Sequence, residues 1–97
     1  MIIVHDIFIC KPGNASKLAK KFKEAMAGSS ELVNIMTDMT GQYNRVVMVS
    51  QYQNLTDYEQ SWKKYEQDTE AMKKMNEAMS GYQEMYLTGS REIYQTW

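Results

Sequence analysis

Apolar side chains recur with two different periods along this chain, and the periods separate strands from helices. Short apolar runs rich in β-branched residues are typical of strands, whereas apolar positions three and four residues apart are typical of an amphipathic helix. This pattern predicts six elements in the order β-α-β-β-α-β, over residues 2–10, 14–27, 32–40, 45–52, 56–86 and 91–97. Turn residues mark the connections: Pro12-Gly13 follows the first strand and Gly89-Ser90 precedes the last.

The two middle strands are expected to pair as an antiparallel hairpin through Gly41-Gln42-Tyr43-Asn44. The long helical segment after them opens with a capping box from Thr56 to Glu59 and carries one stripe of aromatic residues and methionines. Asp68-Thr69 leaves open whether this segment is one helix or two, and Gly81 is a candidate end for it.

This order of elements predicts one α+β domain over residues 1–97, with the ferredoxin-like topology of a four-stranded antiparallel sheet that carries its helices on one face. A chain of this length buries only about 60–65% of its unfolded surface, so a monomer would be marginally stable. Both faces of the first strand are mostly apolar, and the sheet face without helices therefore needs a cover. The simplest cover is a second copy, which gives a sheet-to-sheet homodimer.

Composition disfavours several classes of protein. A net charge of −1 leaves no basic excess for nucleic acid, and 43% hydrophobic residues do not fit a disordered chain. A single cysteine excludes a disulfide framework within the chain and favours the reducing cytoplasm. The first residues lack a basic n-region, and their apolar run is too short to cross a bilayer, so neither a signal peptide nor a membrane partner is expected.

Several short motifs resemble those of dimeric α+β barrel proteins. Ile9-Cys10-Lys11-Pro12-Gly13 is similar to the strand-then-KPG opening of that superfamily. Other segments are similar to NIPSNAP-like and antibiotic-biosynthesis-monooxygenase-like members: Thr37 to Gly41, Asn44 to Val47, Leu55 to Glu59 and Ser90 to Tyr94. The resemblance covers nearly the whole chain and implies the same fold. The superfamily includes cofactor-less oxygenases, heme-degrading enzymes, isomerases and proteins with no assigned activity, so the fold does not settle the function.

Heme-degrading members of the superfamily use an Asn on the first strand, a Trp on the second helix and a His further along that helix as iron ligand. Aligned from the Gly13-Asn14 turn, Asp6 falls at the Asn position, and Trp62 resembles the Trp. No histidine lies between Trp62 and Tyr86, so the resemblance does not imply heme degradation. No cofactor and no metal site are expected.

Two neighbouring residues of the first strand are the candidate catalytic groups. Asp6 lies on the strand face that also holds Val4 and Phe8; burial there would favour the protonated carboxyl and suit it to general acid or base catalysis. Alternatively, Asp6 is partly solvated, or bonds a tyrosine hydroxyl or a backbone N–H. His5 points to the opposite face, where it is either a packing residue, a proton shuttle or a pH-sensitive interface group.

The candidate substrate-binding residues are mostly aromatic. Trp62, Tyr58 and Tyr65 lie on the helix stripe that faces the sheet, either as core or as the wall of a pocket whose polar tips converge near Asp6. Phe8, Tyr94 and Arg91 complete the set; Arg91 is either a rim charge or the binder of a substrate carboxylate. If the protein is an enzyme, the resemblance together with this set implies a cofactor-independent monooxygenase or isomerase acting on a small hydrophobic or aromatic compound. The alternative is a non-catalytic small-molecule-binding or stress-related dimeric module.

Overall fold

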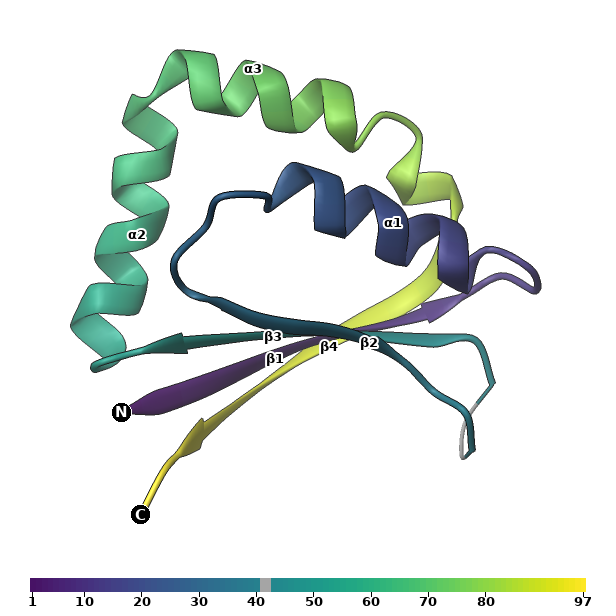
Figure 1. Cartoon of the computed structure of the whole chain (residues 1–97), viewed down its shortest axis with the longest axis horizontal. Helices are drawn as coiled ribbons and strands as arrows, with labels where there is room; N and C mark the ends of the chain where they lie inside the picture. The colour runs from purple at the N-terminus through teal and green to yellow at the C-terminus, as the bar shows by residue number, and fades with distance from the viewer. Residues whose placement is uncertain (41–42) are drawn as a thin grey trace.

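A four-stranded antiparallel sheet carries all the helices on one face (Figure 1). The computed structural model describes residues 1–40 and 43–97. The elements in chain order are β1 (Ile2–Cys10), α1 (Ala15–Ala25), β2 (Leu32–Thr37), β3 (Arg45–Tyr52), α2 (Leu55–Gln67), α3 (Thr69–Ala78), the 3-10 turn η1 (Tyr82–Glu84) and β4 (Tyr86–Gln95). The strand order is β2-β3-β1-β4. The predicted ferredoxin-like α+β fold is therefore confirmed, and the segment that the sequence left open as one helix or two is two.

The central strand β1 decides which side chains meet the helices. It pairs antiparallel with β3 on one side and with β4 on the other, and this register sets Asp6 opposite both Met48 and Arg91. Alternate residues of β1 point to opposite faces, so Val4 and Cys10 are buried under the helices. Ile3 and the other odd-numbered residues point to the open face, where no helix lies (Figure 1).

The core forms where α1 crosses the sheet. Leu18 and Phe22, one turn apart on α1, are buried against Cys10, Val46 and Met79. The lysines of α1 lie on its outer side, as the predicted amphipathic pattern requires. Figure 1 shows α3 running over α1, whereas α2 rises from the end of β3 beside the helix pair. Neither α2 nor α3 contributes a fully buried residue, so α1 supplies most of the helical core.

The helical segment predicted over 56–86 is two helices and a 3-10 turn. The break falls at Asp68, whose extended backbone ends α2 and whose carboxylate accepts a hydrogen bond from the backbone N–H of Ala71 at 3.0 Å. The cap of α2 is Asn54, which accepts from the backbone N–H of Asp57 at 2.8 Å, and the prediction of Thr56 as the cap is wrong. Both caps satisfy N–H groups that a helix start leaves without partners.

The last strand begins earlier than predicted. β4 starts at Tyr86, and Gly89-Ser90 is part of the strand rather than a turn. Gly89 lies opposite Phe8, and a Cβ at this position would lie 3.3 Å from the backbone oxygen of Ile7. The glycine is thus explained by a close approach inside the sheet, not by turn geometry.

The structure describes only part of the connection between β2 and β3. β2 ends at Thr37, three residues before the predicted end. Gly41 and Gln42 lie outside the described residues, so the predicted hairpin loop is described only from Tyr43 onward. The antiparallel pairing of β2 with β3 is confirmed. In the described parts of the chain, 1–40 and 43–97, no helix has the length and apolar character needed to span a membrane.

Candidate functional site

An ion pair joins β1 to β4 beneath α2. Because the register sets Arg91 directly opposite Asp6, Nε of the guanidinium lies 2.6 Å from Oδ1 of the carboxylate. Asp6 is 9% exposed, whereas the Arg91 side chain is 47% exposed. Only Nε is used in this contact, so the terminal nitrogens of the guanidinium keep their N–H donors for another acceptor.

Two aromatic rings of α2 flank this guanidinium. Tyr58 and Trp62 are four residues apart on the helix and therefore lie on the same side of it, with their rings edge to face at 6.3 Å. The guanidinium carbon of Arg91 lies 5.9 Å from the centroid of the Tyr58 ring and 5.6 Å from that of Trp62. Both distances are within the range of cation–π attraction. We call these four residues, Asp6, Tyr58, Trp62 and Arg91, the Arg91 cluster.

The guanidinium of Arg91 keeps its positive charge within the cluster. The hydrogen bond to Asp6 raises the pKa of Arg91 above its usual value, although partial burial opposes this effect. Tyr58 makes a smaller contribution in the same direction, even though its buried hydroxyl has no hydrogen bond of good geometry in the described residues. The cluster therefore presents a fixed, half-exposed cation between two rings, which suits a carboxylate attached to an aromatic body.

All four residues of this cluster were candidates from the sequence, but their contacts with one another differ from the predicted ones. Asp6 is nearly buried on the face that the helices cover, and its partner is Arg91 rather than the predicted tyrosine hydroxyl or backbone N–H. Tyr58 and Trp62 do come together, and both rings contact Arg91, the partner of Asp6. Tyr65 does not: its hydroxyl donates to the backbone oxygen of Ala71 at 3.2 Å and contacts the sulfur of Met75.

Three other predicted residues lie away from the cluster. Phe8 is part of the core, with its ring 4.9 Å from that of Phe22. His5 and Tyr94 share the open face of the sheet, with ring centroids 5.3 Å apart. The Tyr94 hydroxyl donates to the carboxylate of Glu92 at 2.9 Å, and this hydrogen bond raises the pKa of Tyr94. The structure thus divides the predicted set among the Arg91 cluster, the core and the open face.

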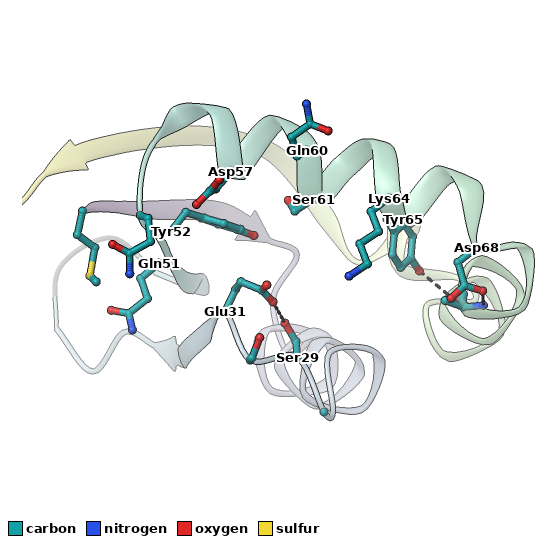
Figure 2. Close-up of a pocket in the computed structure, with 15 residues that line it drawn as sticks. Ser29, Glu31, Gln51, Tyr52, Asp57, Gln60, Ser61, Lys64, Tyr65 and Asp68 are labelled. Carbon is teal, nitrogen blue, oxygen red and sulfur yellow. Dashed lines mark hydrogen bonds between the residues drawn. The ribbon is translucent and has the colours of Figure 1, made fainter.

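A cleft that sequence analysis missed lies on the other side of α2 (Figure 2). It has a volume of about 690 Å³, within the range of about 300–1,000 Å³ typical of small-molecule sites. Its walls are α2, the connection between α1 and β2, and the end of β3; they contribute Glu31, Gln51, Tyr52, Asp57, Gln60, Ser61, Lys64, Tyr65 and Asp68, among others. Of the predicted site residues, only Tyr65 lines it. The segments that form its walls are far apart in the sequence and have an ordinary surface composition, so no local sequence pattern predicts the cleft.

The helix α2 separates this cleft from the Arg91 cluster. A helix turns once every 3.6 residues, so Asp57, Ser61, Lys64 and Asp68 fall along one side, whereas Trp62 falls on another. The two places still share one contact: the ring of Tyr52, which lines the cleft, lies 5.0 Å from that of Tyr58. They are neighbouring but chemically distinct sites.

The remaining reactive groups do not form a further centre. Cys10 is buried, and burial raises the pKa of its thiol, which disfavours the nucleophilic thiolate. In residues 1–40 and 43–97, no three His, Cys, Asp or Glu side chains are arranged to hold a metal ion.

The class of protein follows from the fold: a small ferredoxin-like α+β protein whose helices cover one face of the sheet and whose β1, β4 and α2 together contribute a candidate ligand site. The chain belongs to the NIPSNAP family, whose family model matches residues 7–88. The resemblance predicted from the sequence motifs is therefore confirmed. A comparison with curated proteins finds no match.

Solved structures agree with this assignment. A NIPSNAP family protein from Agrobacterium tumefaciens has a TM-score of 0.77 at 14% identity, over 97% of this chain and 90% of that one. An uncharacterised NIPSNAP-like domain protein from Burkholderia xenovorans has a TM-score of 0.77 at 17% identity, over 99% and 84% of the two chains. A candidate antibiotic biosynthesis monooxygenase from Nitrosomonas europaea has a TM-score of 0.67 at 12% identity, over 99% and 98%. These identities show a shared fold and no more.

Proposed function

We propose that this NIPSNAP family protein binds a small aromatic carboxylate at the Arg91 cluster. The observation that carries the proposal is the half-exposed guanidinium, which Asp6 fixes on one side while Tyr58 and Trp62 flank it. The free N–H donors suit the two oxygens of a carboxylate, and the Trp62 ring, on a residue that is 46% exposed, suits an aromatic body. The single unpaired cysteine supports a reducing compartment, the cytoplasm.

A cofactor-independent monooxygenase or isomerase is the second candidate. It is supported by the similar fold of the candidate monooxygenase from Nitrosomonas europaea, and by the joint position of Asp6 and Trp62 in one cluster. Proton transfer by Asp6 would require its carboxylate to leave Arg91. The binding module is therefore the better supported of the two. If turnover of an aromatic compound is found, Asp6→Asn and Trp62→Phe should each reduce it, and unchanged turnover in both would exclude this chemistry.

Thermal unfolding in the presence of benzoate tests the binding proposal. Benzoate should raise Tm, because a ligand of the native state stabilises it by mass action, and benzamide should not. Arg91→Gln should weaken benzoate binding by about tenfold or more, the effect of losing about 1.4 kcal/mol of a charge-assisted contact. Lys20→Gln, at an exposed position on α1, is the matched control and should bind benzoate normally. Equal shifts with benzoate and benzamide, or none with either, would overturn the proposal.

The same protein is proposed to act as a sheet-to-sheet homodimer. The support is the open face of the sheet, where apolar side chains gather on neighbouring strands without a helix above them: Ile3, Ile7, Ile9, Met36 and Val47. A chain of 97 residues also gains more from burying such a face than a larger protein would. A two-fold axis would set this face against itself.

An open-face charge should break the proposed dimer. Ile7 lies mid-strand opposite Val47, so Ile7→Glu would place an unpaired carboxylate inside the interface. We expect the dimer Kd to rise by about a hundredfold or more, which corresponds to about 3 kcal/mol. Light scattering after gel filtration measures the mass. Leu55→Glu, on a residue of α2 that is 59% exposed, should leave the mass unchanged. A monomeric mass for the unmodified protein at micromolar concentration would contradict the proposal.

A further inference from the structure

Unlike charges face each other across the cleft beside α2 without pairing. Lys64 reaches from α2 toward the wall that carries Glu31, as Figure 2 shows. In the described part of the chain the ion pairs join Arg91 to Asp6 and Lys63 to Glu59, so the ammonium of Lys64 has no carboxylate within 4.0 Å. One oxygen of Glu31 accepts from the hydroxyl of Ser29 at 3.1 Å. The other oxygen and the Lys64 ammonium are both available to a ligand between them.

The balance of charge in the cleft is negative. Among the side chains, Glu31, Asp57 and Asp68 contribute three carboxylates against the one ammonium of Lys64. One carboxylate oxygen of Asp68 caps α3 by accepting a hydrogen bond from the backbone N–H of Ala71 at 3.0 Å. Asp57 makes no ion pair of its own among the residues described, and it lies near the ring of Tyr52 in Figure 2. A ligand with more ammonium than carboxylate groups would complete this arrangement.

We propose that the cleft binds a free diamino acid of the lysine or ornithine type, independently of the Arg91 cluster. Its carboxylate pairs with Lys64, its α-ammonium pairs with Glu31, and its side-chain ammonium lies near Asp57 and the face of Tyr52. A cation over a tyrosine ring gains cation–π attraction in addition to the ion pair. The about 690 Å³ of the cleft leaves room for the side chain. The same charges predict an order of affinity, in which basic amino acids bind most tightly, neutral ones less tightly and acidic ones most weakly.

Thermal unfolding with a set of related small molecules tests this site. L-lysine at about 10 mM should raise Tm by about 7 °C, the shift expected for a Kd near 1 mM in a domain of this size. Cadaverine lacks the carboxylate, norleucine lacks the side-chain ammonium and L-glutamate has the opposite net charge; each should give a smaller shift. Lys64→Gln and Glu31→Gln should each weaken lysine binding by about tenfold or more, since each removes one ion pair.

Two control variants separate this site from its neighbours. Lys63→Gln removes the adjacent lysine, which pairs with Glu59 at 3.7 Å and is absent from the cleft wall, so it should bind lysine normally. Arg91→Gln should also bind lysine normally, because the Arg91 cluster lies on another side of α2. Circular dichroism checks that each variant is folded. No Tm shift with lysine, or an equal shift with cadaverine, would overturn the proposal.

A double-mutant cycle tests the alternative that Lys64 and Glu31 form an ion pair with each other and bind no ligand. If Lys64 and Glu31 simply pair with each other in solution, the two substitutions will be coupled in the stability of the ligand-free protein. Additive effects without ligand, together with coupling in the presence of lysine, are the expected result. Coupling without ligand that lysine does not change would contradict the proposed site.

Discussion

Leu18→Ala should lower the free energy of unfolding by about 3 kcal/mol, within the range of about 2–5 kcal/mol measured for buried leucines. Leu18 is fully buried on the inner side of α1, in contact with the cluster formed by Phe22, Cys10, Val46 and Met79. Truncation removes apolar contacts and leaves a cavity that the sheet beneath cannot close. In a domain whose total stability is about 5–15 kcal/mol, this loss should reduce Tm by about 10 °C or more.

Chemical denaturation at fixed protein concentration measures this loss. Leu55→Ala is the matched control, because Leu55 is a leucine on α2 that is 59% exposed. Its substitution should change stability by no more than about 0.5 kcal/mol. If Leu18→Ala cost less than about 1 kcal/mol, α1 would not be the main cover of the sheet, and the packing described above would be wrong.

Asp6→Asn should lower the free energy of unfolding by about 2 kcal/mol, the second largest effect on folding stability that we expect. Asp6 is nearly buried and holds the guanidinium of Arg91 at 2.6 Å, so the substitution leaves a cation without its carboxylate beside two aromatic rings. Breaking a fully buried pair costs about 3–5 kcal/mol. The expected value is lower because the Arg91 side chain is 47% exposed and water replaces part of the lost contact.

The exposed ion pair on α2 provides the control for this prediction. Glu59 and Lys63 lie 3.7 Å apart with side chains that are 68% and 58% exposed, so Glu59→Gln should change stability by about 0.5 kcal/mol or less. The double variant Asp6→Asn/Arg91→Gln should be more stable than the sum of the two single losses predicts, because it leaves no unpaired charge. Strict additivity would show that the pair is not formed in solution.

The cluster also shows how far a candidate site can be predicted from sequence. Alternation along β1 placed Asp6 on one face with Val4 and Phe8, and only the tertiary structure shows that the helices cover this face. Helical spacing placed Tyr58 and Trp62 on one side of α2. The sequence predicts Arg91 at the start of a strand, because Gly89-Ser90 is typical of a turn. The partner of Asp6 follows from the β1–β4 register, which is set by contacts between residues 85 positions apart. No local pattern carries that information.

The direction of α2 likewise could not be predicted from local patterns, and it decides both the contacts of Tyr65 and the position of the cleft. The stripe of aromatic residues and methionines predicted one continuous contact with the sheet. The chain instead turns at Asp68, so that α3 runs over α1 and α2 stands beside the helix pair (Figure 1). The Tyr65 hydroxyl is therefore directed to α3, and burial, with a smaller effect of Asp68, raises its pKa. The side of α2 with Asp57, Ser61 and Lys64 is left to line a cleft.

By itself, the sequence determined the order of strands and helices, the apolar face of α1, the two apolar faces of β1 and the resemblance to the NIPSNAP family. The elements and their apolar faces follow from side-chain periods of two and 3.6 residues, which depend only on neighbours along the chain, whereas the resemblance rests on short motifs. The tertiary structure alone decided that Asp6 meets Arg91, that Phe8 belongs to the core, and that a polar cleft opens beside α2. Those outcomes depend on strand register and helix direction, which many weak contacts between distant segments fix together.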